Sequence, residues 1–367
     1  MYENETPAAT RSAADALAAL LPQLAAAERE HDRNGVTAVD NLRLLADSGL
    51  LAVNTPRELG GMGETLSGTI ETIRSIAQAS PSTALMFAMH TSTLSHYLVA
   101  PEHVPAGERE AFLAQRQWAF GEVLNGRIFA VANSEAGAGG DVKNSKAEMR
   151  DGRLTGDKTF CSMGTNAQYY MAAARDESGT VDYWLVRNDG ERVNVAKPWN
   201  AVGMRSSESV SLRFEAAPVV GALAYRGLLD GPNNRHWATL SFTAVFVGAA
   251  ESLLDLLRDG SGILHATTAV DLHLALQACR AFLRHCVAIE PSPATGDYRR
   301  LARDCKLFVT RTLAHHATAA YSAQGGSAYR FDSPLSRTLR DLLAGPALRP
   351  PVGVAFDEVW EEIRGAT

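Results

Sequence analysis

The residues that could do chemistry gather in two short segments near the middle of the chain. The first reads Ser-Glu-Ala-Gly-Ala-Gly-Gly-Asp over residues 134–141, and the second reads Thr-Gly-Asp-Lys-Thr-Phe-Cys-Ser over residues 155–162. Glycines let backbone N–H groups approach an anion closely, so Gly139 and Gly140 could cradle a phosphate. A plain tight turn explains the same glycines equally well, and the run alone does not decide between the two.

Metal sites and catalytic triads receive no support from residue spacing. His315 and His316 are adjacent, so on a helix they point about 100° apart, and His90 and His96 are six residues apart rather than four. The sequence holds no HExxH, no GxSxG nucleophile elbow and no GxxxxGK[ST] phosphate loop. We therefore predict neither a metal site nor a triad.

Five segments together resemble signatures of the acyl-CoA dehydrogenase superfamily. Residues 134–141 are similar to its TEPxAGSD signature, and residues 155–162 are similar to NGxKxWIT. Residues 55–63 (TPRELGGMG) resemble PxxxGGxG, and residues 203–209 (GMRSSES) resemble GMRxSxT. Gly325-Gly326, Pro334 and Arg340-Asp341 resemble GGxxxxxxxPxxRxxRD. Because the five occur in the family's order and spacing, the resemblance covers about residues 12–345.

The resemblance implies an α+β, mostly helical fold: a helical N-domain, a central β-barrel-like domain and a C-terminal four-helix bundle. The residues themselves indicate the same order. Apolar residues recur at helical spacing to about residue 125, short β-rich runs follow, and helical spacing returns from about residue 235. We predict domain boundaries at 1–125, 126–225 and 226–367. Asp151-Gly152 predicts a hairpin, and Asp189-Gly190 suggests a similar turn.

The resemblance also implies roles for single residues. In the family, the hydroxyl at the position of Ser134 contacts the edge of a flavin ring, and the aromatic at the position of Phe160 packs against that ring. The hydroxyl at the position of Ser162 reaches flavin N5. These types suit a flavin, which is a flat amphiphile that needs an apolar wall and a few placed polar groups. Further flavin contacts are implied at Gly139, Gly140, Gly325 and Gly326.

Two features of acyl-CoA dehydrogenases are missing. Desaturation needs a glutamate that removes the α-proton of the substrate, yet residues 342–349 (LLAGPALR) and 236–238 (HWA) hold no carboxylate at the family's two positions. Asp357 or Glu358 could fold back as a displaced base. The Arg-x-x-Phe-Gly motif that grips the FAD pyrophosphate is also absent from residues 258–262. We therefore favour FMN, with FAD as the alternative.

Both departures resemble the family's branch of two-component flavin monooxygenases, such as dibenzothiophene monooxygenase, the oxygenase of p-hydroxyphenylacetate hydroxylase and amino-sugar N-oxygenases. Such enzymes take reduced flavin from a separate reductase and form a C4a-hydroperoxide with oxygen. The branch has a histidine in the helix after a Ser-x-Ala run, as at His90, so we predict that His90 and Ser162 border this intermediate as catalytic residues. Arg349 replaces a histidine of the branch and suits an anionic group of the substrate.

We therefore predict a flavin-dependent oxidoreductase, an oxygen-using monooxygenase acting on a small or carrier-bound substrate. The alternatives are an acyl-CoA or acyl-carrier-protein dehydrogenase with a displaced base, and a non-catalytic scaffold subunit. A separate flavin reductase is a possible partner. Apolar residues surround much of the segments 234–258 and 264–289, which predicts self-association, as a homotetramer in the family.

Composition limits the remaining partners and the location. The 367 residues are 46% hydrophobic and carry a formal net charge of -6, which disfavours a nucleic-acid partner. The most apolar window, residues 85–100, is too short and polar to span a membrane, and the start of the chain has no secretory pattern. Four cysteines without a CxxC pair are typical of reduced thiols. We expect a cytoplasmic protein with no membrane partner.

Overall fold

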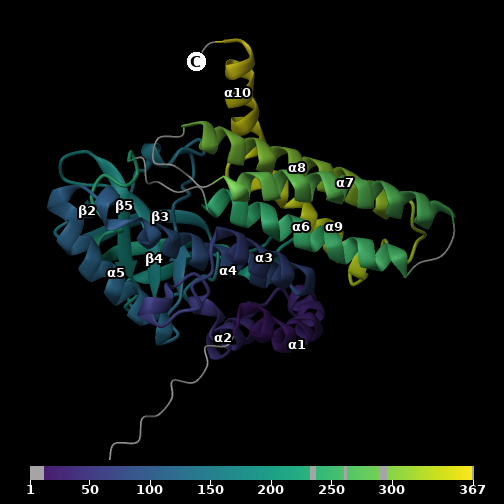
Figure 1. The fold of residues 1–367 in the computed structure, drawn as a ribbon, viewed down its shortest axis with the longest axis horizontal. Helices are drawn as coiled ribbons and strands as arrows, with labels where there is room; N and C mark the ends of the chain where they lie inside the picture. The colour runs from purple at the N-terminus through teal and green to yellow at the C-terminus, as the bar shows by residue number, and fades with distance from the viewer. Residues whose placement is uncertain (1–11, 232–236, 260–262, 290–295, 366–367) are drawn as a thin grey trace, which may run out of the picture.

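A helical region, a sheet and a second helical region follow one another along the chain (Figure 1). The computed structural model describes residues 12–231, 237–259, 263–289 and 296–365. The sheet lies on one side and the long C-terminal helices on the other, with the N-terminal helices between and below them in the view of Figure 1. This arrangement, with its barrel-like central sheet, confirms the predicted fold class.

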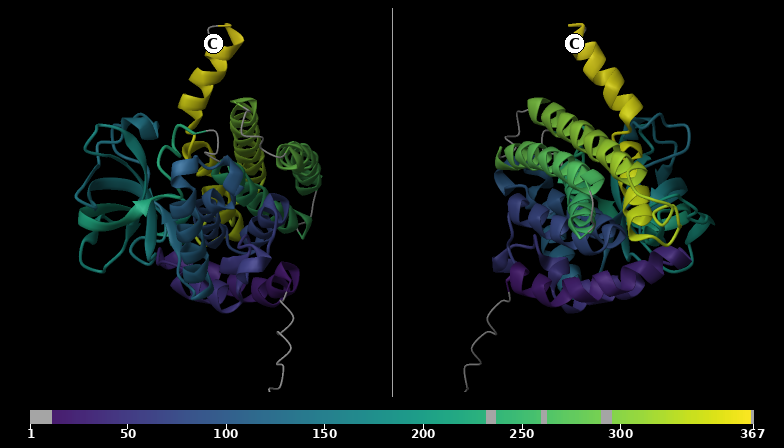
Figure 2. Two further views of the ribbon diagram at one scale, coloured as in Figure 1. Left: turned by 60° about the vertical axis from the view of Figure 1, so that its left-hand side comes forward. Right: turned by 90° about the vertical axis from the view of Figure 1, so that its right-hand side faces the viewer.

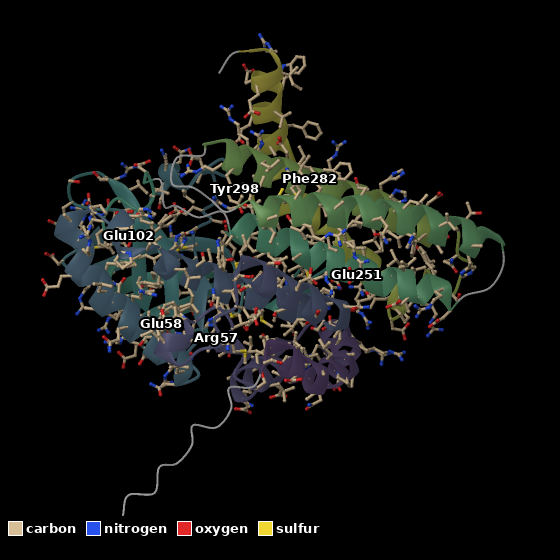
Figure 3. All side chains as sticks on the ribbon, viewed as in Figure 1. Arg57, Glu58, Glu102, Glu251, Phe282 and Tyr298 are labelled. Atoms are coloured by element: carbon tan, nitrogen blue, oxygen red, sulfur yellow. The ribbon has the colours of Figure 1, made fainter. Side chains whose placement is uncertain are left out.

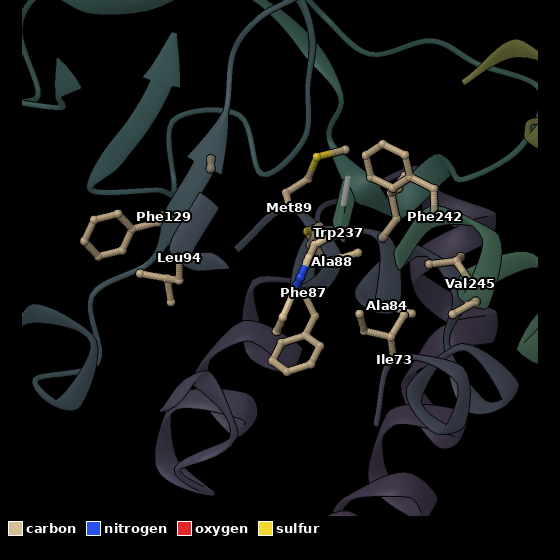
Figure 4. Packing of buried hydrophobic residues seen from close by; sticks show 14 of the residues in the cluster. Ile73, Ala84, Phe87, Ala88, Met89, Leu94, Phe129, Trp237, Phe242 and Val245 are labelled. Carbon is tan, nitrogen blue, oxygen red and sulfur yellow. The ribbon is translucent and has the colours of Figure 1, made fainter. Parts of the chain in front are cut away.

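Helix α4 runs through the centre of the N-terminal region. The helices here are α1 (Ala13–Asn34), α2 (Val39–Asp47), α3 (Leu66–Ala79), α4 (Pro81–Ser95) and α5 (Arg109–Leu124). Helix α4 begins at Pro81, and the Ser80 side chain caps it by accepting a hydrogen bond from the Thr83 N–H. All of its residues are buried. In Figure 4, Met89 points to the side on which Phe242 lies, and Phe87 points the opposite way.

The central strands close into a barrel because β5 pairs with both β4 and β7. The strands are β1 (Phe129–Val131), β2 (Glu148–Arg150), β3 (Arg153–Cys161), β4 (Tyr169–Arg175), β5 (Val181–Arg187), β6 (Val193–Lys197) and β7 (Val210–Ala222). Asp151-Gly152 joins β2 and β3 in the predicted hairpin, with φ of 48° and 69°. The similar role suggested for Asp189-Gly190 is wrong, because β5 and β6 each pair with β7 instead of with each other.

Helix α6 is the core of the C-terminal region. The helices are α6 (Trp237–Arg258), α7 (Ile263–Ala288), α8 (Gly296–Ser322), α9 (Pro334–Leu343) and α10 (Val352–Ile363). Helix α6 is long and apolar enough to cross a membrane, but 78% of its most apolar window is buried inside this chain, as expected of a core helix. Its Glu251, labelled in Figure 3, pairs with Arg74 of α3 and Arg280 of α7 and so joins the two helical regions. Helix α10 projects away from the body of the molecule (Figures 1 and 2).

A set of contacts that we call the clasp joins all three regions, through Asp32, Gly203, Met204, Arg340 and Asp341. Arg340 of α9 donates two hydrogen bonds to Asp32 of α1, at 2.6 and 3.1 Å. The Met204 N–H donates to Asp341 Oδ1 at 2.6 Å. A side chain at position 203 would collide with the Arg340 backbone carbonyl, so this close approach requires glycine. Two of the signature segments thus hold the regions together.

Candidate functional site

A cleft of about 750 Å³ lies where the sheet meets α4, α6 and the segment that follows α9. Its wall is largely apolar, with Met89 from α4 and Phe242 from α6 among the lining residues. The polar side chains of Ser134, Ser162 and Arg349 also line it. An apolar cleft with a few placed polar groups suits a flat ligand of mixed polarity.

Phe160 is part of the lining of the cleft. The residue is 59% exposed in this chain. The pairing between β3 and β7 shifts register between Lys158 and Cys161, and within this irregularity Phe160 takes a φ of 56°. That left-handed conformation costs an aromatic residue about 1–3 kcal/mol. The ring meets Trp199 edge to face, with centroids 6.2 Å apart, and the two rings form one aromatic wall.

Ser162 lies at the cleft at one end of a chain of hydroxyl groups. Its Oγ is 2.9 Å from Ser209 Oγ, which is 2.8 Å from Ser207 Oγ. The Ser207 hydroxyl donates to the Met204 carbonyl at 2.8 Å. We call Ser162, Ser209 and Ser207 the serine relay. Its members come from the residue after β3, the residue before β7 and the short helix at Arg205–Ser207.

Ser134 and Arg349, which are 215 residues apart in the chain, meet in the cleft. Arg349 Nε donates to Ser134 Oγ at 2.9 Å, and burial lowers the pKa of the guanidinium from its ordinary value. Lys306 of α8 holds the segment that carries Arg349, because its Nζ donates to the carbonyls of Leu348 and Pro350, each at 2.7 Å. Burial lowers the pKa of Lys306 to about 8. Two predicted site residues are therefore in direct contact.

Glu135 lines the cleft but is fully engaged. Its carboxylate accepts hydrogen bonds from Lys158 Nζ at 2.5 Å and from the backbone N–H groups of Lys146 and Ala147. Burial raises the pKa of Glu135, whereas hydrogen bonds from Lys158, Ser145 and the backbone lower it. The hydrogen bonds together outweigh burial, so the pKa of Glu135 lies below its ordinary value. The pair fixes the 134–141 segment against β3. Glu135 is thus an anchor and not a free base.

The predicted glycines divide into two groups. Gly140 lines the cleft, and both Gly139 and Gly140 have positive φ, at 64° and 87°. Gly325 and Gly326 follow the end of α8 and do not line this cleft. They lie beside a second hollow, which His265, Gln324 and Ser327 help to line. One chain alone does not bring the two groups together.

His90 lies outside the cleft, against our expectation that it borders the reacting centre. Its Nε2 is 2.9 Å from the Leu51 carbonyl, and its Nδ1 accepts from the Phe129 N–H at 3.1 Å. Both ring nitrogens therefore bind backbone, and burial lowers the pKa of the ring to about 4. His90 is a neutral core residue that ties α4 to neighbouring segments. The surrounding run of apolar residues, typical of a helix buried on all sides, was a signal for this role.

No free carboxylate lines the cleft in the described part of the chain, where Glu135 is the sole acidic lining residue. Glu358, one candidate for a displaced base, lies on the projecting helix α10 and pairs with Arg303 of α8 at 3.1 Å. Asp357 lies on the same helix. His236 lies outside the described residues. Among the residues described, no cluster of three or more His, Cys, Asp or Glu side chains could hold a metal ion.

Sequence reasoning missed Trp199, Ser207, Ser209 and Lys306. Ser207 and Ser209 stand in the segment that resembles GMRxSxT, so that motif was a usable signal for them. Trp199 precedes the same segment by a few residues, and its Nε1–H donates to the Met204 carbonyl at 2.9 Å. No sequence motif pointed to Lys306, because this residue meets Leu348 only in the folded chain.

Known protein families match most of the chain. The acyl-CoA dehydrogenase N-terminal domain matches residues 5–101, the middle domain residues 130–217 and the C-terminal domain residues 240–347. The matches fall on the helical, sheet and helical regions in turn.

Individual relatives match between 63% and 100% of the chain. L-evernosamine nitrososynthase of a Micromonospora species is 26% identical over 94% of this chain and 87% of its own length. Dibenzothiophene monooxygenase of Rhodococcus erythropolis is 31% identical over 63% of this chain and 57% of its own. The solved structure of KijD3 with FMN and a dTDP-linked amino sugar superposes with a TM-score of 0.81, at 24% identity, over 100% of this chain and 96% of that one.

Proposed function

The chain belongs to the acyl-CoA dehydrogenase superfamily, and from that premise we propose that it is a flavin-dependent monooxygenase that uses FMN supplied in reduced form by a separate reductase. The relatives described above are a nitrososynthase and a monooxygenase by name. Together with the residues of the cleft, they favour oxygen transfer to a nitrogen or sulfur atom of a small molecule.

The residues of the cleft fit a flavin. Phe160 and Trp199 offer an aromatic wall that nothing in the described chain covers on the cleft side. The strain at Phe160 supports this role, because a backbone held in a costly conformation at a cleft is a common sign of function. Ser134 and Ser162 would serve the polar edges of the ring system, and Gly140 allows close approach of backbone.

The observation that carries the proposal is the state of the carboxylates. α,β-Desaturation needs a carboxylate free to take a proton from the substrate, and Glu135, the acidic lining residue described, is held by Lys158 and two backbone N–H groups. Reduced flavin supplies two electrons to oxygen, so that one oxygen atom passes to the substrate and the other leaves as water. The apolar lining excludes bulk water from that reaction.

Arg349 supports an anionic substrate. Its Nε binds Ser134, and its two Nη atoms have no hydrogen-bond partner among the described residues. A guanidinium with free Nη atoms can bind a carboxylate or phosphate through two parallel hydrogen bonds. We propose a substrate, free or attached to an anionic carrier, with an oxidisable heteroatom at one end and an acidic group at the other.

Isotope incorporation tests the proposal. The protein is mixed with FMN, NADH and an unrelated flavin reductase under ¹⁸O₂, and amine and sulfur compounds with and without an acidic group are compared by mass spectrometry. We expect one ¹⁸O atom in the product. Arg349→Met should raise KM for the acidic compounds, while Arg349→Lys keeps the charge as a matched control. Reduction of the bound flavin by an acyl thioester without oxygen, together with no ¹⁸O in any product, would overturn the proposal.

We also propose that copies of the chain associate. Phe356, Trp360 and Ile363 are exposed on the projecting helix α10, and Gly325 and Gly326 stand away from the cleft of their own chain. Association would let these glycines serve the flavin of a neighbouring copy, as the family resemblance implies. Light scattering should give a mass well above the 39.3 kDa of one chain. A stable single chain at micromolar concentration would contradict this.

A further inference from the structure

The serine relay has a direction. A hydroxyl has one proton to donate and two lone pairs that accept. The Ser207 oxygen lies 2.8 Å from the Met204 carbonyl oxygen, and two oxygens this close repel unless a proton lies between them. A carbonyl cannot donate, so the proton of Ser207 points at Met204.

The direction passes along the relay one hydroxyl at a time. Because Ser207 has used its proton, the 2.8 Å bond between Ser207 and Ser209 must be donated by Ser209. Ser209 has then used its own proton, so the 2.9 Å bond between Ser209 and Ser162 must be donated by Ser162. Ser162 is left with lone pairs and no free proton, and it lines the cleft in this state.

We propose that the serine relay makes Ser162 a hydrogen-bond acceptor toward the cleft and thereby favours reduced over oxidised flavin. The proposal rests on the proposed function, in which Ser162 meets the N5 edge of the ring. Reduced flavin carries an N–H at N5 and can donate to Ser162, whereas oxidised flavin has a lone pair there. Ser207 is a positioning residue, because it does not line the cleft and acts through Ser209 and Ser162, whereas Ser209 orients Ser162 and also lines the cleft.

The relay gives the Ser162 hydroxyl one fixed orientation. It also accounts for selection between two redox states of one molecule. A site that must accept reduced flavin from another protein, and release it when oxidised, needs a group that distinguishes an N–H donor at N5 from a lone pair at N5. A lone hydroxyl cannot do so, because it rotates to suit either partner.

Equilibrium binding of the two redox states tests the relay. The dissociation constants of oxidised FMN and, without oxygen, of reduced FMN are measured for the intact chain and for four single variants. Ser209→Ala frees the Ser162 proton, so the preference for reduced FMN should fall about threefold to tenfold. Ser207→Ala leaves Ser209 free either to donate to Ser162 or to accept from it, so the preference should fall by a similar factor. Ser207 does not itself line the cleft.

Ser206→Ala is the matched control. Ser206 is buried in the same short helix, and its hydroxyl has no hydrogen-bond partner in the described chain, so the preference should stay unchanged. Ser209→Thr keeps the hydroxyl and should restore the preference, which separates the relay from a loss of folding. An equal preference in all variants would overturn the relay while leaving the proposed function intact. Absence of FMN binding in either redox state would overturn both.

Discussion

Two buried charge clusters flank the cleft, and they differ in how their charge is balanced. In the first, Glu135 and Lys158 form one ion pair within the sheet region, and the hydrogen bond from Lys158 helps to hold the pKa of Glu135 below its ordinary value. In the second, Glu28, Asp32 and Asp341 gather in and around the clasp. There burial, followed by repulsion from Asp341, raises the pKa of Glu28 to about 8.

The difference shows what each cluster does for the molecule. The balanced pair fixes one loop on one strand, and the pKa values of both partners lie below their ordinary values: burial lowers that of Lys158, and the hydrogen bond from Lys158 helps to lower that of Glu135. The carboxylate-rich cluster joins α1, the 203–205 segment and α9, and burial raises the pKa of Asp341 to about 7. Contacts between regions therefore depend on protonation around neutral pH.

The largest expected effect comes from breaking the balanced pair. Lys158→Met leaves the carboxylate of Glu135 buried without its cation, which should lower the free energy of unfolding by about 3–5 kcal/mol. Urea unfolding followed by circular dichroism measures this. Lys143→Met is the control, since its ion pair with Asp230 is exposed and should contribute less than about 1 kcal/mol. A loss as small as the control would mean that the pair is not what fixes the loop.

A smaller loss is expected from the clasp. Asp32→Asn removes the charge that Arg340 contacts through both of its Nη atoms, and the free energy of unfolding should fall by about 2–3 kcal/mol. Arg340 keeps its bonds to the carbonyls of Val202 and Phe331, which limits the loss. Asp32 also raises the pKa values of Glu28 and Asp341. Stability should therefore depend less steeply on pH in this variant, and an unchanged slope would contradict the coupling.

The third effect should be a gain in stability that depends on pH. Folding raises the pKa of Glu28 from 4.5 to about 8, so between these pH values the folded chain binds more protons than the unfolded chain, and stability falls as the pH rises. Glu28→Gln removes this titration and still accepts from Ser80. The variant should match the parent near pH 4.5, and its advantage in free energy of unfolding should grow steadily as the pH rises toward 8. Thermal unfolding of the variant and the parent between pH 4.5 and 8 measures this difference. A variant less stable than the parent at pH 8 would exclude an excess of negative charge around Glu28.

The sequence predicted the parts of this molecule that depend on local pattern. The order of helices and strands follows from apolar spacing, and the signature segments led to Ser134, Phe160 and Ser162, all of which line the cleft. The expectation that His90 borders the reacting centre failed, because the position of a histidine in a helix does not reveal its hydrogen-bond partners. Both of those are backbone groups about 39 residues away along the chain.

What the sequence could not predict depends on distant contacts and on the direction of hydrogen bonds. The contact of Arg349 with Ser134 joins residues 215 positions apart, and no local sequence pattern predicts it. Helix α9 was recognised as a motif and not as a helix, although Ser333 caps it and Pro334 begins it. The direction of the serine relay needs three distances measured together, which residue types alone do not supply.

Lys306 has a consequence for the entropy of binding. Its ammonium group binds the carbonyls on both sides of Arg349, so the backbone that carries the guanidinium is fixed before any ligand arrives. Ordering the backbone of a mobile residue costs about 1–2 kcal/mol, and ordering a long side chain adds a similar amount. An anion that meets Arg349 therefore loses little affinity to loop ordering. Its association should be nearly a docking of rigid bodies, fast and with a small change in heat capacity.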